Sequence, residues 1–98
     1  MIKVRPGIVL IHVCDQSLLV SAYEARQHCP YVTILNETGE VIWNCLNEGK
    51  SVSDIVQKVT DMFDIPSDIK VEQMIIGFIE QLYKNGYVLF EEEREYEL

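Results

Sequence analysis

Apolar and polar positions divide the chain into two parts with different periods. Short apolar runs bounded by turn-forming residues predict strands at Ile8–Val13, Leu18–Tyr23 and Tyr31–Leu35. The segment Val4–Gly7 contains proline and glycine, so we expect the first strand to begin only after it. Beyond residue 36, apolar residues recur every three or four positions, which is the period of a helix. The pattern predicts an α+β fold with a three-stranded antiparallel sheet followed by three helices.

The third predicted strand passes directly into the first helix at Asn36. The Asn36 side chain can accept hydrogen bonds from the free N–H groups of a first turn. Glu37 and Glu40 then place negative charge where the helix dipole favours it. The apolar residues that follow share one helical face, namely Val41, Ile42, Cys45 and Leu46. We therefore predict a capped helix that starts immediately after a strand.

Two further helices are predicted, each with its own start and stop signals. Ser51–Asp54 has the form of a capping box and begins a helix of about three turns. A third helical pattern runs from Ile69 to Lys84, and Asn85–Gly86 ends it. Tyr87–Phe90 is a short extended segment, which we assign as a candidate fourth strand at the edge of the sheet.

The third predicted helix carries more apolar surface than one core requires. At about 100° per residue, a first stripe comprises Val71, Ile75, Phe78 and Leu82, flanked by Met74 on one side and Ile79 on the other. A second stripe, rotated by roughly a third of a turn or more, comprises Ile69, Ile76 and Tyr83. Either the second stripe packs against the sheet, or it forms one wall of an apolar groove beside the third strand. An exposed strand edge next to an apolar helix suits a peptide that binds by adding a strand.

Length and charge restrict the function classes. The 98 residues allow one domain with a modest core, and the formal net charge is −8. Residues 91–98 contain five glutamates and one arginine, so we predict a domain over 1–90 and a disordered acidic tail over 91–98. An acidic surface repels nucleic-acid phosphates, and Lys70 and Lys84 are the only basic residues from 69 to 86.

The sequence also lacks targeting and membrane signals. The longest apolar run, Ile8–Ile11, is too short to cross a bilayer, and the N-terminus does not have the form of a signal peptide. The three cysteines are Cys14, Cys29 and Cys45, and no two of them form a Cys-x-x-Cys motif. An odd number of cysteines without such a framework indicates reduced thiols in a reducing compartment. We therefore expect a soluble cytoplasmic protein.

Four residues are candidates for metal binding or nucleophilic chemistry: His12, Cys14, His28 and Cys29. Their nitrogen and sulfur atoms would suit zinc, but the spacing matches no common zinc motif. A cysteine–histidine nucleophilic pair would also need an orienting group and an oxyanion hole, which the sequence does not supply. We predict no metal, cofactor or catalytic residue, and interpret Trp43 as a packing residue.

The segment Leu35–Gly39 followed by Ile42–Trp43 resembles the PqqD family, whose most specific motif reads Leu-Asn-x-Thr-Gly and then Ile-Trp. The likeness extends roughly over residues 8–88. Its further matching positions are Leu46, Glu48–Val52, Ile55, Val56, Phe78, Leu82 and Gly86. The resemblance implies a winged-helix-like domain known as the recognition element of RiPPs, the ribosomally synthesised and post-translationally modified peptides. Such a domain binds the leader segment of a precursor peptide. The polar connection between Tyr23 and Tyr31 and the acidic tail depart from the family pattern.

The resemblance also implies where the peptide binds, because in this family the leader adds to the third strand and lies in a cleft beside the third helix. Carried over by position, the strand wall is Tyr31, Val32, Thr33, Ile34 and Leu35. The facing helix residues are Ile69, Ile76 and Tyr83, with Glu72 and Glu80 at the rim for basic leader residues. The protein would itself catalyse nothing, and would present the peptide to a modifying enzyme such as a radical SAM protein or a leader peptidase.

Two other possibilities remain open at this point. A winged-helix DNA-binding regulator would have a similar order of strands and helices, although the acidic charge argues against it. An uncovered strand edge can also pair with a second copy of the chain, so a homodimer is compatible with the sequence.

Overall fold

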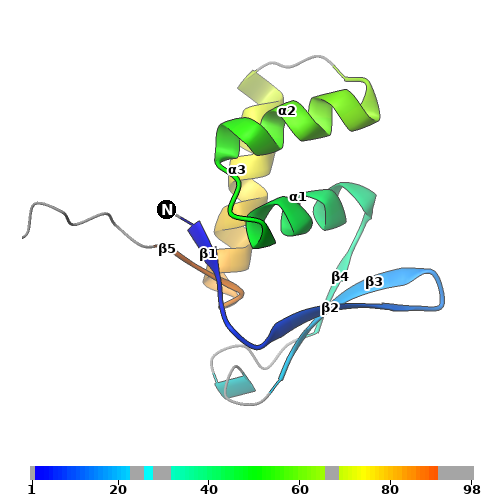
Figure 1. Ribbon diagram of the computed structural model, residues 1–98, viewed down its shortest axis with the longest axis vertical. Coiled ribbons are helices and arrows are strands. Elements are labelled where there is room, and N and C mark those ends of the chain that lie inside the picture. Colours follow the sequence, from blue (N-terminus) through cyan, green and yellow to red (C-terminus); the bar gives the residue numbers. More distant parts are fainter. Residues whose placement is uncertain (1, 23–25, 28–31, 66–68, 91–98) are drawn as a thin grey trace, which may run out of the picture.

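The computed structural model describes residues 2–22, 26–27, 32–65 and 69–90. Its elements are β1 (Ile2–Val4), β2 (Ile8–Val13), β3 (Gln16–Ser21), β4 (Thr33–Leu35), α1 (Glu37–Asn47), α2 (Val52–Phe63), α3 (Ile69–Lys84) and β5 (Val88–Phe90). The hairpin of β2 and β3 lies below α1 in the view of Figure 1, and β4 leads directly into α1. The predicted order of three paired strands and then three helices is confirmed. The predicted tail at 91–98 lies outside the described residues.

The main sheet is antiparallel with the strand order β2-β3-β4. Cys14 and Asp15 form its hairpin turn, with φ of 50° and 66°. Positive φ at both central residues is typical of the two-residue turn that matches the twist of a hairpin. Val13 therefore pairs with Gln16, so the strand begins at Gln16 and not, as predicted, at Leu18.

The two faces of this sheet have different surroundings. Along β3, Ser17, Leu19 and Ser21 are buried and face the helices, as the two-residue period of a strand requires. The opposite face is apolar but open to solvent. Its exposed residues include Val9, Ile11, Val13 and Ile34.

Two predictions about the chain ends are wrong. β1 forms before the Pro6–Gly7 break, which separates β1 from β2 and does not precede the first strand. β5 pairs with β1 in a second, two-stranded antiparallel sheet, and does not extend the main sheet. Two hydrogen bonds from Arg5 support this pairing, since its backbone N–H donates to the carbonyl oxygen of Tyr87 (3.0 Å) and its Nε to that of Gly86 (2.6 Å).

Local signals set the helix starts as predicted. The Asn36 side chain accepts a hydrogen bond from the Gly39 N–H at 2.7 Å. The capping box is complete, because Ser51 Oγ accepts from the Asp54 N–H (3.2 Å) and an Asp54 oxygen accepts from the Ser51 N–H (3.4 Å). Gly49 has a φ of 82°, the left-handed conformation that closes α1.

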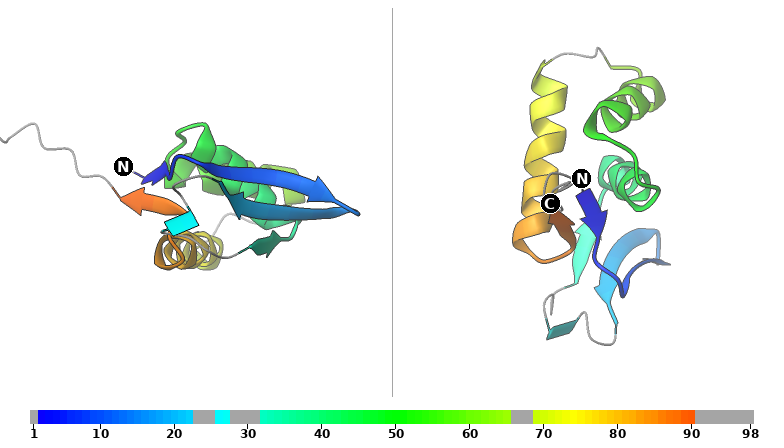
Figure 2. Two further views of the ribbon diagram at one scale, coloured as in Figure 1. Left: turned by 90° about the horizontal axis from the view of Figure 1, so that it is seen from below. Right: turned by 60° about the vertical axis from the view of Figure 1, so that its left-hand side comes forward.

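The core lies between the three helices and the inner face of the main sheet, and α3 stands beside α1 and α2 (Figure 2). Trp43 is buried and meets Tyr87 edge to face, with ring centroids 6.5 Å apart, which confirms it as a packing residue. Among the described residues, the largest fully buried side chains are those of Leu19, Ile42, Ile55, Val59, Ile75, Tyr87 and Val88. Among the described residues, no helix has the length and apolar character needed to cross a membrane.

Candidate functional site

β4 is an edge strand with one side unpaired. One side of β4 pairs with β3, with Leu35 opposite Ser17 and Thr33 opposite Leu19. No strand among the described residues pairs with its other side. Thr33 and Leu35 face the core, whereas Ile34 points the other way and is 62% exposed. The N–H and C=O groups on the free side of β4 are therefore available to another extended chain.

A hydrogen bond fixes the position of β4 relative to the core. Thr33 Oγ1 lies 2.7 Å from the hydroxyl oxygen of Tyr87. Tyr87 is fully buried between α3 and β5, and its ring contacts Trp43. This bond joins the edge strand to the segment that follows α3, so the free edge of β4 has a defined place beside that helix.

The start of α1 approaches α3 closely at Gly39. A Cβ atom added at Gly39 would lie 3.2 Å from the Asn36 side-chain oxygen and 3.3 Å from the tip of the Phe78 ring. A larger residue would therefore push against both the cap and the ring. The glycine in the sequence Leu-Asn-x-Thr-Gly thus allows Phe78 of α3 to approach the first turn of α1.

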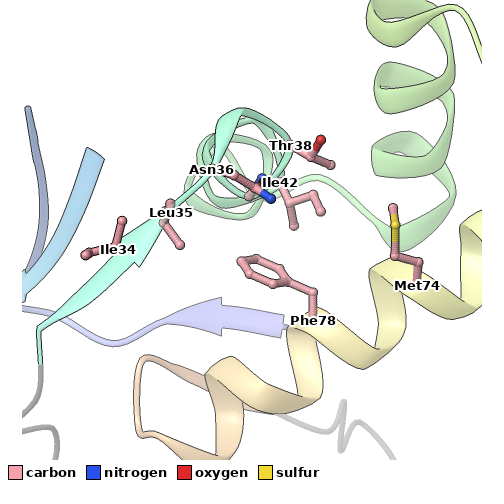
Figure 3. Close-up of a pocket in the computed structure, with 8 residues that line it drawn as sticks. Ile34, Leu35, Asn36, Thr38, Ile42, Met74 and Phe78 are labelled. Carbon is pink, nitrogen blue, oxygen red and sulfur yellow. Dashed lines mark hydrogen bonds between the residues drawn. The ribbon is translucent and has the colours of Figure 1, made fainter. Parts of the chain in front are cut away.

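A cavity of about 250 Å³ opens between the end of β4, the start of α1 and one flank of α3. Its lining residues are Ile34, Leu35, Asn36, Thr38, Gly39, Ile42, Met74 and Phe78. Phe78 reaches from α3 toward Leu35 and Ile42, and Met74 lies one turn earlier on the same helix (Figure 3). The cavity lies next to the free edge of β4, so an extended chain on that edge could place a side chain in it.

The structure brings together only some of the residues proposed from the sequence. Ile34 and Leu35 line the cavity, and Val32 is 60% exposed just before β4. Tyr31 and the side chain of Ile69 lie outside the described residues. The other proposed residues on α3 are all exposed, namely Glu72, Ile76, Glu80 and Tyr83.

The cavity is lined by a flank of α3 that the sequence-based assignment did not choose. At about 100° per residue, Ile76 lies roughly 160° around the helix from Met74. Met74 and Phe78 line the cavity, whereas Ile76 and Tyr83 do not. Phe78 belonged to the predicted core stripe and Met74 to its flank, so the helical period contained both residues but could not show which flank faces β4. A role of Ile76 and Tyr83 in peptide binding stays a prediction.

Residues 31–88, more than half of the chain, match the family model described as "Coenzyme PQQ synthesis protein D (PqqD)". The chain belongs to the PqqD family. A comparison with curated proteins finds no match to this PqqD-family chain.

Two solved structures share the fold of this PqqD-family protein. "TbiB1 in Complex with the TbiA(beta) Leader Peptide" has a TM-score of 0.74 and 21% sequence identity, covering 93% of this chain and 99% of that one. "Lasso peptide synthetase B1 complexed with the leader peptide" has a TM-score of 0.73 and 22% identity, covering 91% of this chain and 98% of that one. The similarity extends over nearly the whole chain, and at these identities it establishes the fold.

Glu40 connects the hairpin to α1 in this PqqD-family chain. One carboxylate oxygen accepts a hydrogen bond from Ser17 Oγ at 2.5 Å, and the other lies 2.9 Å from His12 Nε2. The hydrogen bonds from Ser17 and then His12 hold the pKa of Glu40 below its ordinary value. Glu40 therefore links the end of the hairpin to the first turn of α1, close to the junction at Asn36.

The structure describes only two of the four residues considered for metal binding or nucleophilic chemistry, namely His12 and Cys14. His28 and Cys29 lie outside the described residues, while His12 contacts Glu40. Within the described ranges, no three His, Cys, Asp or Glu side chains are grouped as metal ligands would be. Cys14 is exposed in the hairpin turn, and Cys45 is buried. Burial, followed by the charge of Glu48, raises the pKa of the Cys45 thiol, which disfavours the reactive thiolate.

Proposed function

We propose that this PqqD-family protein binds the leader segment of a ribosomally synthesised precursor peptide and presents the peptide to a modifying enzyme. The leader adds as a strand to the free edge of β4, along Val32–Leu35 and the preceding Tyr31. The observation that carries the proposal is the unpaired edge of β4 beside a cavity. The two solved structures with this fold are complexes with leader peptides, which supports the proposal.

The size and lining of the cavity suit a peptide side chain. Small-molecule sites are typically cavities of about 300–1,000 Å³, and this cavity is about 250 Å³. Its lining is predominantly apolar, with Ile34, Met74 and Phe78 on its two sides. We infer that main-chain hydrogen bonds to β4 provide affinity and that an apolar leader side chain in the cavity provides selectivity.

The protein contributes to modification by tethering the peptide, and not by chemistry of its own. Binding the leader raises the effective concentration of the attached core peptide at the active site of a bound enzyme. A nucleophile would need an adjacent base and an orienting group. Among the described residues, Cys14 is solvent-exposed in a turn and Cys45 has a raised pKa, so neither has the surroundings of a catalytic thiol. The modifying enzyme would be a radical SAM protein or a leader peptidase.

A pair of variants on α3 tests which residues contact the leader. Met74→Glu places a charge beside the cavity, and Ile76→Glu places the same charge on the far side of the helix. Both residues are solvent-exposed, at 48% and 38%, so both variants should fold. With labelled leaders of precursor peptides encoded near the gene, fluorescence anisotropy should show at least about tenfold weaker binding for Met74→Glu. The affinity of Ile76→Glu should change little.

Two other results of this binding experiment would contradict the assignment of contact residues or the proposed function. If Ile76→Glu weakens binding and Met74→Glu does not, the sequence-based wall of Ile69, Ile76 and Tyr83, with Glu72 and Glu80 at its rim, is correct instead. If the wild-type protein binds none of the candidate leaders at micromolar concentration, the proposed function is wrong. Circular dichroism and thermal unfolding of each variant serve as controls for folding.

A further inference from the structure

Two residues of the second apolar stripe of α3, Ile76 and Tyr83, are partly exposed to solvent. Ile76 is 38% exposed and Tyr83 49%. The Tyr83 ring packs against Phe90 of β5, with centroids 4.7 Å apart, and Phe90 is itself 49% exposed. These three side chains form a surface from the middle of α3 to the end of β5, which we call the α3 outer face.

The α3 outer face and the cavity are on different sides of the helix. Ile76 lies roughly 160° around α3 from Met74, which lines the cavity. Between these two directions on one side lies the buried stripe of Ile75, Ile79 and Leu82, which packs into the core. A large partner on the α3 outer face would therefore leave the free edge of β4 accessible to a peptide.

Two exposed glutamates of α3 flank Ile76 on the α3 outer face. Glu72 and Glu80 lie one turn before and one turn after Ile76, and both are exposed. In the part of the chain that the structure describes, neither carboxylate forms an ion pair. Lys84 is the one basic residue of the last turn of α3. A matching surface would therefore be apolar at its centre and basic at its rim.

We propose that the α3 outer face is the docking surface for the enzyme that processes the bound peptide, and that the enzyme contributes an apolar patch surrounded by lysine and arginine. This inference rests on the proposed function. A second copy of the chain fits less well, because self-association would bring Glu72 and Glu80 together with the same carboxylates of the copy. Tyr83 has the properties of an interface anchor, because tyrosine provides large contact area at low conformational cost and is enriched among binding hot spots.

Two variants test the docking surface, with a matched control in the cavity. Tyr83→Lys removes the aromatic anchor, and Glu80→Lys reverses a rim charge on an exposed helix position where folding is not at risk. Met74→Lys places the same new charge on the cavity flank. The full-length proteins are immobilised, and biolayer interferometry measures binding of the purified processing enzyme encoded near the gene. Anisotropy measures binding of the labelled leader separately.

We expect Tyr83→Lys and Glu80→Lys to weaken enzyme binding at least about tenfold and to leave leader affinity within about twofold. The loss for Glu80→Lys should shrink as salt is raised, because rim charges act mainly through screened electrostatics. Met74→Lys should weaken leader binding and leave binding of the enzyme to the leader-free protein unchanged.

Three results would overturn this inference: no binding of the enzyme to the wild-type protein, unchanged enzyme affinity in both variants, or a loss of leader affinity in place of enzyme affinity. A wild-type protein that binds the enzyme but no leader would contradict the proposed function alone. The two proposals can therefore fail separately.

Discussion

The hydrogen bond between Thr33 and Tyr87 offers a direct test of how the free edge of β4 is held in place. Thr33 Oγ1 and the Tyr87 hydroxyl lie 2.7 Å apart, and Tyr87 is otherwise enclosed by the core. Tyr87→Phe removes the hydroxyl and keeps the ring that meets Trp43. The change therefore affects the bond between the edge strand and the core more than the packing of the core.

The expected size of the effect follows from the nature of this bond. A hydrogen bond between neutral groups contributes about 0.5–1.5 kcal/mol net, because folding exchanges it for bonds to water. Thr33 is half-buried, so water can replace part of the lost contact. We expect Tyr87→Phe to lower the free energy of unfolding by about 1 kcal/mol. For a domain of this size, that corresponds to a Tm lower by roughly 4–8 °C.

Urea unfolding followed by Trp43 fluorescence measures the change, because Trp43 is the only tryptophan and is buried. A double-mutant cycle with Thr33→Val and Tyr87→Phe isolates the pairwise contribution. We expect the two substitutions to be coupled by about 1 kcal/mol. If their effects are simply additive, the bond does not hold β4 to the core, and our explanation of the strand position is wrong.

Three further predictions concern the junction, the hairpin and the thiols. Asn36→Ala removes the cap on Gly39 and should lower stability by about 0.5–2 kcal/mol in the same unfolding assay, whereas an unchanged stability would show that the cap contributes nothing. The hydrogen bonds from Ser17 and His12 hold the pKa of Glu40 in the folded state below its ordinary value, so the stabilisation from its carboxylate is complete above the unfolded-state pKa and is lost as the pH falls through the folded-state pKa. The stability difference between wild type and Glu40→Gln should therefore shrink as the pH is lowered, and a difference that does not shrink on acidification would contradict this assignment. Peptide-resolved alkylation should modify Cys14 long before Cys45, because Cys45 is buried and its pKa is raised; equal rates would contradict the structure.

Local signals predicted the helices well, and long-range pairing was missed. Asn36 and the Ser51–Asp54 box each satisfy the first turn of their own helix, so a few adjacent residues determine the helix start. β1 and β5 are each three residues long and lie at opposite ends of the described chain, so neither carries enough pattern to identify its partner. Their pairing depends on packing against the core, including buried Val88, which the sequence does not display locally.

Two of the strand residues chosen from the sequence, Ile34 and Leu35, line the cavity, whereas none of the chosen α3 residues whose side chains are described lines it. Ile34 and Leu35 could be selected from the sequence because they belong to the strand that ends just before a capped helix. On α3, the period of 3.6 residues separates two apolar stripes but contains no information on which flank faces β4. The approach of Phe78 to Gly39 decides that geometry, and it depends on how α1 and α3 cross. Ile76 and Tyr83 of the second apolar stripe are exposed on the other side of the helix.

Hydrogen exchange of the backbone amides of β4 tests the central claim most directly. The exchange rates of Thr33, Ile34 and Leu35 are measured by mass spectrometry or NMR, with and without a saturating leader peptide. A leader that adds as a strand forms main-chain hydrogen bonds along the free edge, so amides of β4 that point away from β3 should be protected. If the leader binds and exchange in β4 is unchanged while another segment becomes protected, binding by strand addition to β4 is contradicted.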